Sequence, residues 1–72
     1  MAPTTNQEYA PHQQRVVDEK TELQDKFSKL GAFILDNPLF NSLDSPEQVD
    51  LQSQYDVMGT YLEILERRIS RF

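Results

Sequence analysis

The feature that most constrains the fold is an unbroken alternation of four and three residues between apolar positions in the last third of the chain. These positions are Leu51, Tyr55, Met58, Leu62, Leu65, Ile69 and Phe72. Apolar residues at this spacing share one face of an α-helix, and a period of about 3.5 residues favours a neighbouring helix packed at a small, left-handed angle. The chain is therefore predicted to contain a long helix that packs against another helix.

A second apolar stripe precedes the first and has one position taken by a charge. Its apolar members are Val16, Leu23, Phe27, Leu30 and Ile34. Lys20 falls where a further apolar residue belongs. Pro11 suits a first helical turn, because its missing N–H has no partner there. Pro38 drives Asn37 out of the α region, so this helix is predicted over residues 11–36.

The start of the later helix has its own signal. Ser45 is predicted to cap it, with Pro46 in the first helical position and Gln48 completing a capping box, which stabilises the helix by about 1 kcal/mol. The helix is expected over about residues 46–71. The connection contains Leu39, Phe40 and Leu43, which are too apolar for a free loop, and we expect a short turn that closes the core.

The expected fold class is all-α: an antiparallel two-helix hairpin that associates into a helical bundle. Residues 1–8 are polar and are expected to form a flexible tail before a single domain over residues 9–72. A 72-residue chain buries only about 60% of its unfolded surface, and this one has no cysteine for disulfides. Apolar residues beside the stripes also exceed what one partner helix can cover: Val17, Phe33, Leu35, Tyr61 and Ile64. We therefore expect a homo-oligomer, a dimer or larger.

Two glycines, Gly31 and Gly59, interrupt the predicted helices. Glycine costs a helix interior about 1 kcal/mol relative to alanine. Each follows a core position, so close backbone approach at an interface is the expected benefit.

Charge and motif content narrow the function classes. Seven Lys and Arg against twelve Asp and Glu give a net charge of −5, which argues against general nucleic-acid binding. No apolar run approaches the roughly 20 residues of a membrane span, and the first residues lack the pattern of a secretory signal, so we expect a cytoplasmic protein. There is no nucleophile–base set and no phosphate-binding glycine loop. His12 alone cannot form a metal site, so we expect no enzyme, no cofactor and no metal.

The candidate binding residues lie at the open end of the hairpin, where both chain termini should lie. If the chain turns near residue 41, positions whose numbers sum to about 82 lie at one level. Five cations and an aromatic residue then gather there: Arg15, Lys20, Arg67, Arg68, Arg71 and Tyr61. Arginines donate paired hydrogen bonds to phosphates, and Tyr61 or Tyr9 could stack on a base.

A purely structural interpretation of the same residues stays open. The i,i+4 pairs Glu63–Arg67, Glu22–Lys26 and Asp25–Lys29 are typical of solvated helix faces, and arginines in a last turn complement the helix dipole. Lys20 could pair with Glu63 or Glu66 or fix the register of an oligomer instead of meeting a ligand phosphate.

Nearly the whole chain, roughly residues 12 to 72, resembles a family of small tailed-bacteriophage proteins. The first helix carries this resemblance in the run from Gln14 to Leu23, then in Lys26, Lys29-Leu30 and Phe33-Ile34. The second helix carries it in Met58, Tyr61-Leu62, Leu65, Arg68-Ile69 and Phe72. The hairpin is also loosely similar to helical-hairpin sponges of the anti-CBASS and anti-Thoeris type.

The second resemblance implies an oligomer that sequesters a cyclic-nucleotide immune signal in the infected bacterial host without cleaving it. The open-end cations would then bind phosphate. The alternatives are a module that binds and inhibits a host defence protein, and a structural or regulatory phage protein.

Overall fold

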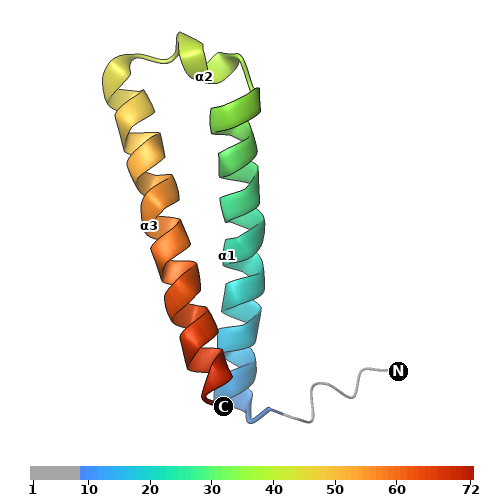
Figure 1. The fold of residues 1–72 in the computed structure, drawn as a ribbon. Helices are drawn as coiled ribbons and strands as arrows, with labels where there is room; N and C mark the ends of the chain where they lie inside the picture. The colour runs from blue at the N-terminus through green and yellow to red at the C-terminus, as the bar shows by residue number, and fades with distance from the viewer. Residues whose placement is uncertain (1–8) are drawn as a thin grey trace.

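The computed structural model describes residues 9–72, so the tail expected over residues 1–8 lies outside the described part. The elements are α1 (Pro11–Asp36), α2 (Leu39–Ser42) and α3 (Ser45–Ser70). α1 and α3 have 26 residues each, about 39 Å at 1.5 Å per residue. They run antiparallel as the two arms of a hairpin, and α2 joins them (Figure 1). The predicted all-helical hairpin is confirmed, with the first helix at its expected bounds.

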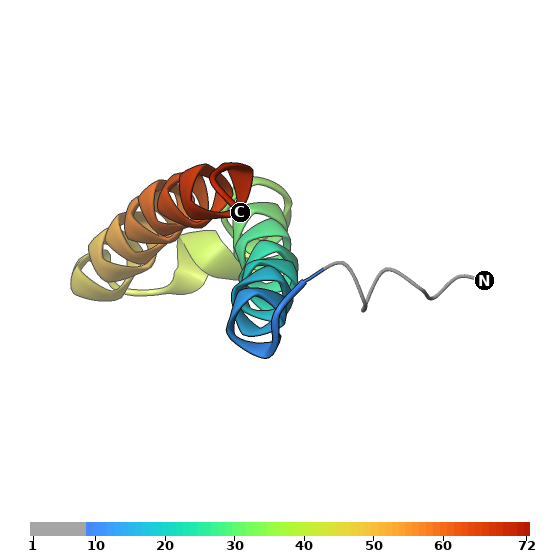
Figure 2. The ribbon, with the colours of Figure 1, turned by 90° about the horizontal axis from the view of Figure 1, so that it is seen from below.

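The two arms are closest at the open end and diverge towards α2 (Figure 1). The view from below shows the same divergence, with the end of α3 beside α1 and its start far from it (Figure 2). At the open end Tyr9 and Phe72 meet edge to face, with ring centroids 5.9 Å apart. The most deeply buried side chains of the arms, Val16, Leu62 and Leu65, belong to this half. The core is therefore concentrated near the two ends of the described chain.

A stacked pair of rings joins the arms at mid-length. Phe27 of α1 and Tyr55 of α3 lie parallel, with centroids 4.3 Å apart and planes 3° apart. A Cβ atom added to Gly31 would lie 2.8 Å from Cε1 of Tyr55, and one added to Gly59 would lie 3.3 Å from Cε1 of Phe27. Each ring thus occupies space that the glycine of the opposite helix leaves open. The sequence predicted close backbone approach at an interface, whereas within the hairpin the glycines make room for aromatic rings.

The closed end is filled by one aromatic side chain. Phe40 of α2 is buried and meets Phe33 edge to face, with centroids 6.1 Å apart. Leu39 is 62% exposed, so it takes no part in the closure that the sequence predicted for it. Nε2 of Gln48 donates to the carbonyl oxygens of Phe40 and Leu43, both at 3.0 Å. This amide ties α3 to the connection.

The predicted cap of α3 is wrong by one residue. Asp44, and not Ser45, is the N-cap, because Oδ1 of Asp44 accepts a hydrogen bond from the backbone N–H of Glu47 at 3.0 Å. A carboxylate at this position is also favoured by the helix dipole. With Asp44 as the N-cap, the third helical residue is Glu47, so Gln48 lies one residue too far along α3 to complete a capping box. α3 therefore covers Ser45–Ser70, one residue earlier than expected at each end.

Most of the predicted core is only partly buried in the single chain. The half-buried members of the two stripes are Leu23, Phe27, Leu30, Ile34, Leu51, Tyr55, Met58 and Ile69. Two helices form one layer, and a layer has two sides that a hairpin alone cannot cover. This is the core deficit from which the sequence predicts self-association, which stays a prediction.

Replacing Leu65 tests where the core lies. Leu65 is fully buried, so Leu65→Ala should lower the free energy of unfolding by about 2–5 kcal/mol. Leu35→Ala removes the same atoms from a side chain that is 79% exposed and should cost less than about 0.5 kcal/mol. Urea denaturation followed by circular dichroism measures both free energies of unfolding. Equal losses of stability in the two variants would contradict a core concentrated at the open end.

The two glycines give a second, matched test. Gly31→Ala puts a methyl group against a ring that is already held in a stack, so overpacking should exceed the gain of about 1 kcal/mol in helix propensity. Gly59→Ala meets Phe27 at a more tolerable distance. We expect Gly31→Ala to be the less stable variant by at least about 1 kcal/mol in thermal and urea unfolding. If Gly59→Ala were the less stable variant, the stacked rings would not be the contact that holds the two arms together.

Candidate functional site: the arginine-rich open end

The open end has a charge balance unlike the rest of the chain. Residues 9–20 and 61–72 hold five cations against four carboxylates, whereas residues 21–60 hold two cations against seven carboxylates. The convergence of the arms brings these two segments together (Figure 1). An anionic ligand therefore meets its most favourable electrostatic surroundings here.

Four of the predicted ligand-binding residues have guanidinium groups that are available to a ligand. Arg15, Arg67, Arg68 and Arg71 are exposed. Within residues 9–72 the ion pairs are Lys20–Glu66 and Asp25–Lys29, and these four arginines take part in neither. The expected Asp25–Lys29 pair is thus present at 3.1 Å, while Glu63–Arg67 and Glu22–Lys26 do not form in this part of the chain. Each guanidinium keeps its donors for water or for an anion.

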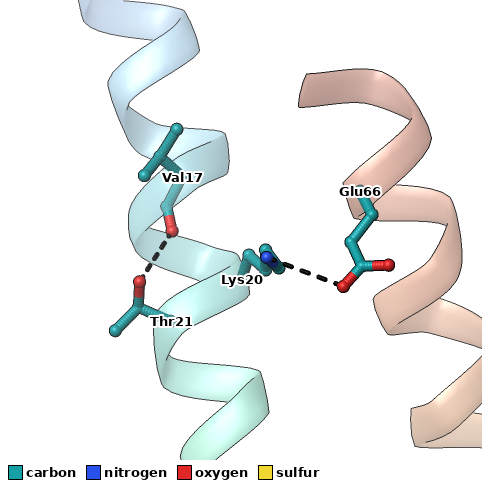
Figure 3. A network of polar contacts seen from close by, with 4 residues as sticks. All are labelled: Val17, Lys20, Thr21 and Glu66. Atoms are coloured by element: carbon teal, nitrogen blue, oxygen red, sulfur yellow. Dashed lines mark hydrogen bonds and ion pairs between the residues drawn. The ribbon is translucent and has the colours of Figure 1, made fainter. Parts of the chain in front are cut away.

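Lys20 already has a partner. Its Nζ lies 3.6 Å from Oε2 of Glu66 on the opposite arm (Figure 3). The Lys20 side chain is 32% exposed and that of Glu66 is 56% exposed. In the residue after Lys20, the hydroxyl of Thr21 donates to the carbonyl oxygen of Val17, one turn back along α1, at 3.1 Å (Figure 3). The structure thus favours the salt bridge across the hairpin among the roles that the sequence left open for Lys20.

Helix geometry divides the predicted cation set between two sides of the hairpin. Successive residues of an α-helix are turned by about 100°, so Lys20 is turned by about 140° from Arg15. On α3, Arg68 is likewise turned by about 160° from Glu66. Arg15 and Arg68 therefore lie away from the side that carries the Lys20–Glu66 pair. Position along the sequence predicted one cluster, and the fold separates Lys20 from it.

Tyr61 shares its side of α3 with Arg68, because the two are seven residues apart. Its side chain is 38% exposed and lies between two other exposed apolar residues, Val57 at 67% and Ile64 at 40%. We call Val57, Tyr61 and Ile64 the outer stripe of α3. Together with Asp56 and Thr60 they line a shallow hollow. Val57 was missed at the sequence level, although its spacing of four and three residues to Tyr61 and Ile64 was visible.

Other features of the described chain offer no alternative site of comparable chemistry. Two further hollows lie nearer the closed end. One is lined by Gly31, Ile34, Leu35, Gln52, Tyr55 and Asp56, and the other by Lys29, Ala32, Phe33, Asp36, Asn37 and Pro38. Residues 9–72 contain no group of three acidic or histidine side chains that could hold a metal ion. No helix in this part of the chain is long and apolar enough to cross a membrane.

The described residues thus form an all-helical hairpin with four exposed arginines at its open end. A family model described as Sequestin matches residues 10–71, which covers both arms, and the chain belongs to this family. No curated protein and no solved structure matches it.

A substitution at Lys20 tests its structural role. A partly exposed ion pair contributes about 0–1 kcal/mol, whereas an apolar residue here would complete the first stripe. Lys20→Met should therefore raise the midpoint of thermal unfolding, and should make it less dependent on salt. A fall by several degrees would show that the pair with Glu66 contributes more than its geometry indicates.

Proposed function

We propose that this protein is a non-catalytic sponge: an oligomer that binds a cyclic-nucleotide immune signal and withholds it from a host defence system. The family name suggests the sequestration of a molecule. The observation that carries the proposal is a set of four exposed arginines at the open end that form no ion pair within residues 9–72, in a chain with net charge −5. Such an arrangement suits a compact polyanion rather than a long nucleic acid.

The chemistry of the open end agrees with a phosphate ligand. Guanidinium groups form bidentate hydrogen bonds to phosphate oxygens, which an ammonium group cannot do. Arg15 on α1 and Arg68 on α3 approach the ligand from opposite arms, and Arg67 adds charge from the neighbouring position. Tyr61 offers a partly exposed ring on the same side as Arg68, on which a base can stack.

A sponge needs affinity and no reaction. The proposed site contains arginines and an aromatic ring, which bind and orient a ligand, and the proposal assigns no chemical step to them. We therefore propose that the ligand leaves unchanged and that the protein acts in stoichiometric amounts. The proposed setting is the cytoplasm of a bacterium infected by a phage, where such signals are made.

The direct test is a thermal-shift screen of the purified protein against cyclic di- and trinucleotides and cyclic ADP-ribose isomers, followed by calorimetric titration. A ligand at 100 times its dissociation constant should stabilise the fold by about 2.7 kcal/mol, a shift of several degrees for so small a domain. Recovery of intact ligand after heating the complex would exclude turnover.

Charge reversal distinguishes the site from a general charge effect. Arg68→Glu and Arg15→Glu should each weaken nucleotide binding at least tenfold. Lys26→Glu is the matched control, because it makes the same charge change on an exposed residue outside the open end and should leave the affinity within about twofold. Equal losses in all three variants would refute the site. A flat screen with a well-folded protein would refute the nucleotide ligand and favour a protein partner.

A further inference from the structure

The outer stripe of α3 is part of a longer pattern that the hairpin leaves uncovered. Val57, Tyr61 and Ile64 each precede a member of the stripe that faces α1, so they lie about 100° around the helix from that stripe. Asp50 lies seven residues before Val57, and Arg71 lies seven residues after Ile64, so both continue the same side of the helix. Both are exposed, and neither takes part in an ion pair within the described residues. One side of α3 thus has an acidic start, an apolar middle and a basic end.

We propose that a second copy of this chain covers the outer stripe, with the two α3 helices packed antiparallel about a two-fold axis near residues 60 and 61. In this register the numbers of facing residues sum to about 121. Val57 of each copy then meets Ile64 of the other, and the two Tyr61 rings lie close to the axis. Three exposed apolar side chains of each copy leave water together.

The charges at the ends of the pattern decide the direction of packing. In the antiparallel register Asp50 of each copy faces Arg71 of the other, and Gln54 faces Arg68. A parallel register would place Asp50 beside Asp50 and Arg71 beside Arg71, which is repulsive at both ends. Opposite charges that flank an apolar centre set the register and suppress the wrong one.

The same pattern explains why the partner is a second copy. A two-fold interface is isologous, so the surface must be complementary to itself. Because the two-fold operation reverses the direction of α3, the acidic start of each copy lies opposite the basic end of the other, and Val57 lies opposite Ile64. A different protein would have to supply this reversed pattern independently.

This interface specifies how the oligomer in the proposed function is built. It rests on the proposed function only in that the sponge is an oligomer. Nucleotide binding plays no part in the packing argument. Tyr61 and Arg71 become interface residues, whereas Arg68 faces only the uncharged Gln54 of the partner subunit and stays available to the ligand with Arg15 and Arg67. In the dimer a base would then stack on Tyr9 rather than on Tyr61. Each dimer would have two such sites, one at the open end of each copy.

The test is a charge-swap series measured by sedimentation equilibrium at micromolar concentration. Asp50→Arg and Arg71→Asp each create two like-charge contacts per dimer, and each should raise the dimer dissociation constant at least tenfold. The double variant restores both contacts with reversed sign and should recover the wild-type constant within about threefold. Circular dichroism of each variant confirms that the helices are intact. A double variant no tighter than the single ones would overturn the register.

Two further substitutions test the apolar centre. Val57→Glu should abolish the dimer, while Leu35→Glu, which puts the same charge on an exposed apolar position of α1, should leave it unchanged. A monomeric wild type, or a dimer that survives Val57→Glu, overturns the interface. Nucleotide titration of the same samples separates the two proposals. A dimer that binds no nucleotide refutes the nucleotide ligand and leaves the interface standing. A monomer that binds nucleotide refutes the interface and the oligomeric state of the sponge, and leaves the ligand standing.

Discussion

The contact on which the rest of the hairpin depends is the ring pair of Phe27 and Tyr55 between two glycines. With a side chain at Gly31, Tyr55 would have to move away from α1, since an added Cβ would lie 2.8 Å from its ring. The stack fixes which residues of the two arms face each other at mid-length. The Tyr9–Phe72 contact keeps nearly the same register at the open end, whereas Lys20 reaches Glu66, about one helical turn beyond the residue that this register places opposite it. The two helices use the same pattern, an aromatic residue followed four positions later by glycine, so each arm both supplies a ring and receives one.

Much of this fold could be predicted from local signals. The spacing of four and three residues gave both long helices, and Pro38 correctly ended α1 at Asp36. The cap of α3 could not be chosen from sequence, because Asp44 and Ser45 are both good cap residues. The choice depends on how the connection closes: Gln48 donates to the carbonyl oxygens of Phe40 and Leu43, and Asp44 accepts from the first turn of α3. The sequence identified polar side chains that could cap α3, but it could not show which backbone group each of them would bind.

The sequence predicted how far along the hairpin the candidate residues lie, but only in part which side of the hairpin they face. Pairing positions whose numbers sum to about 82 placed five cations at the open end, and the fold does bring their segments together. It carried no information on the direction of each side chain around its helix, and so it grouped Lys20 with Arg15 and Arg68. Val57 was missed for a different reason. A single exposed valine attracts no attention until Tyr61 and Ile64 are known to be exposed on the same side.

The concentration of buried side chains at the open end reverses the usual order of local stability. Helix ends at chain termini are commonly the first parts to fray. Here the ends of the two arms hold the fully buried Leu65 and the contact between Tyr9 and Phe72, whereas the diverging half near α2 depends largely on Phe40. We therefore expect local opening of the hairpin to begin at its bend rather than at the ends of the two arms. The arginines are attached to the half that this expectation makes the more stable one.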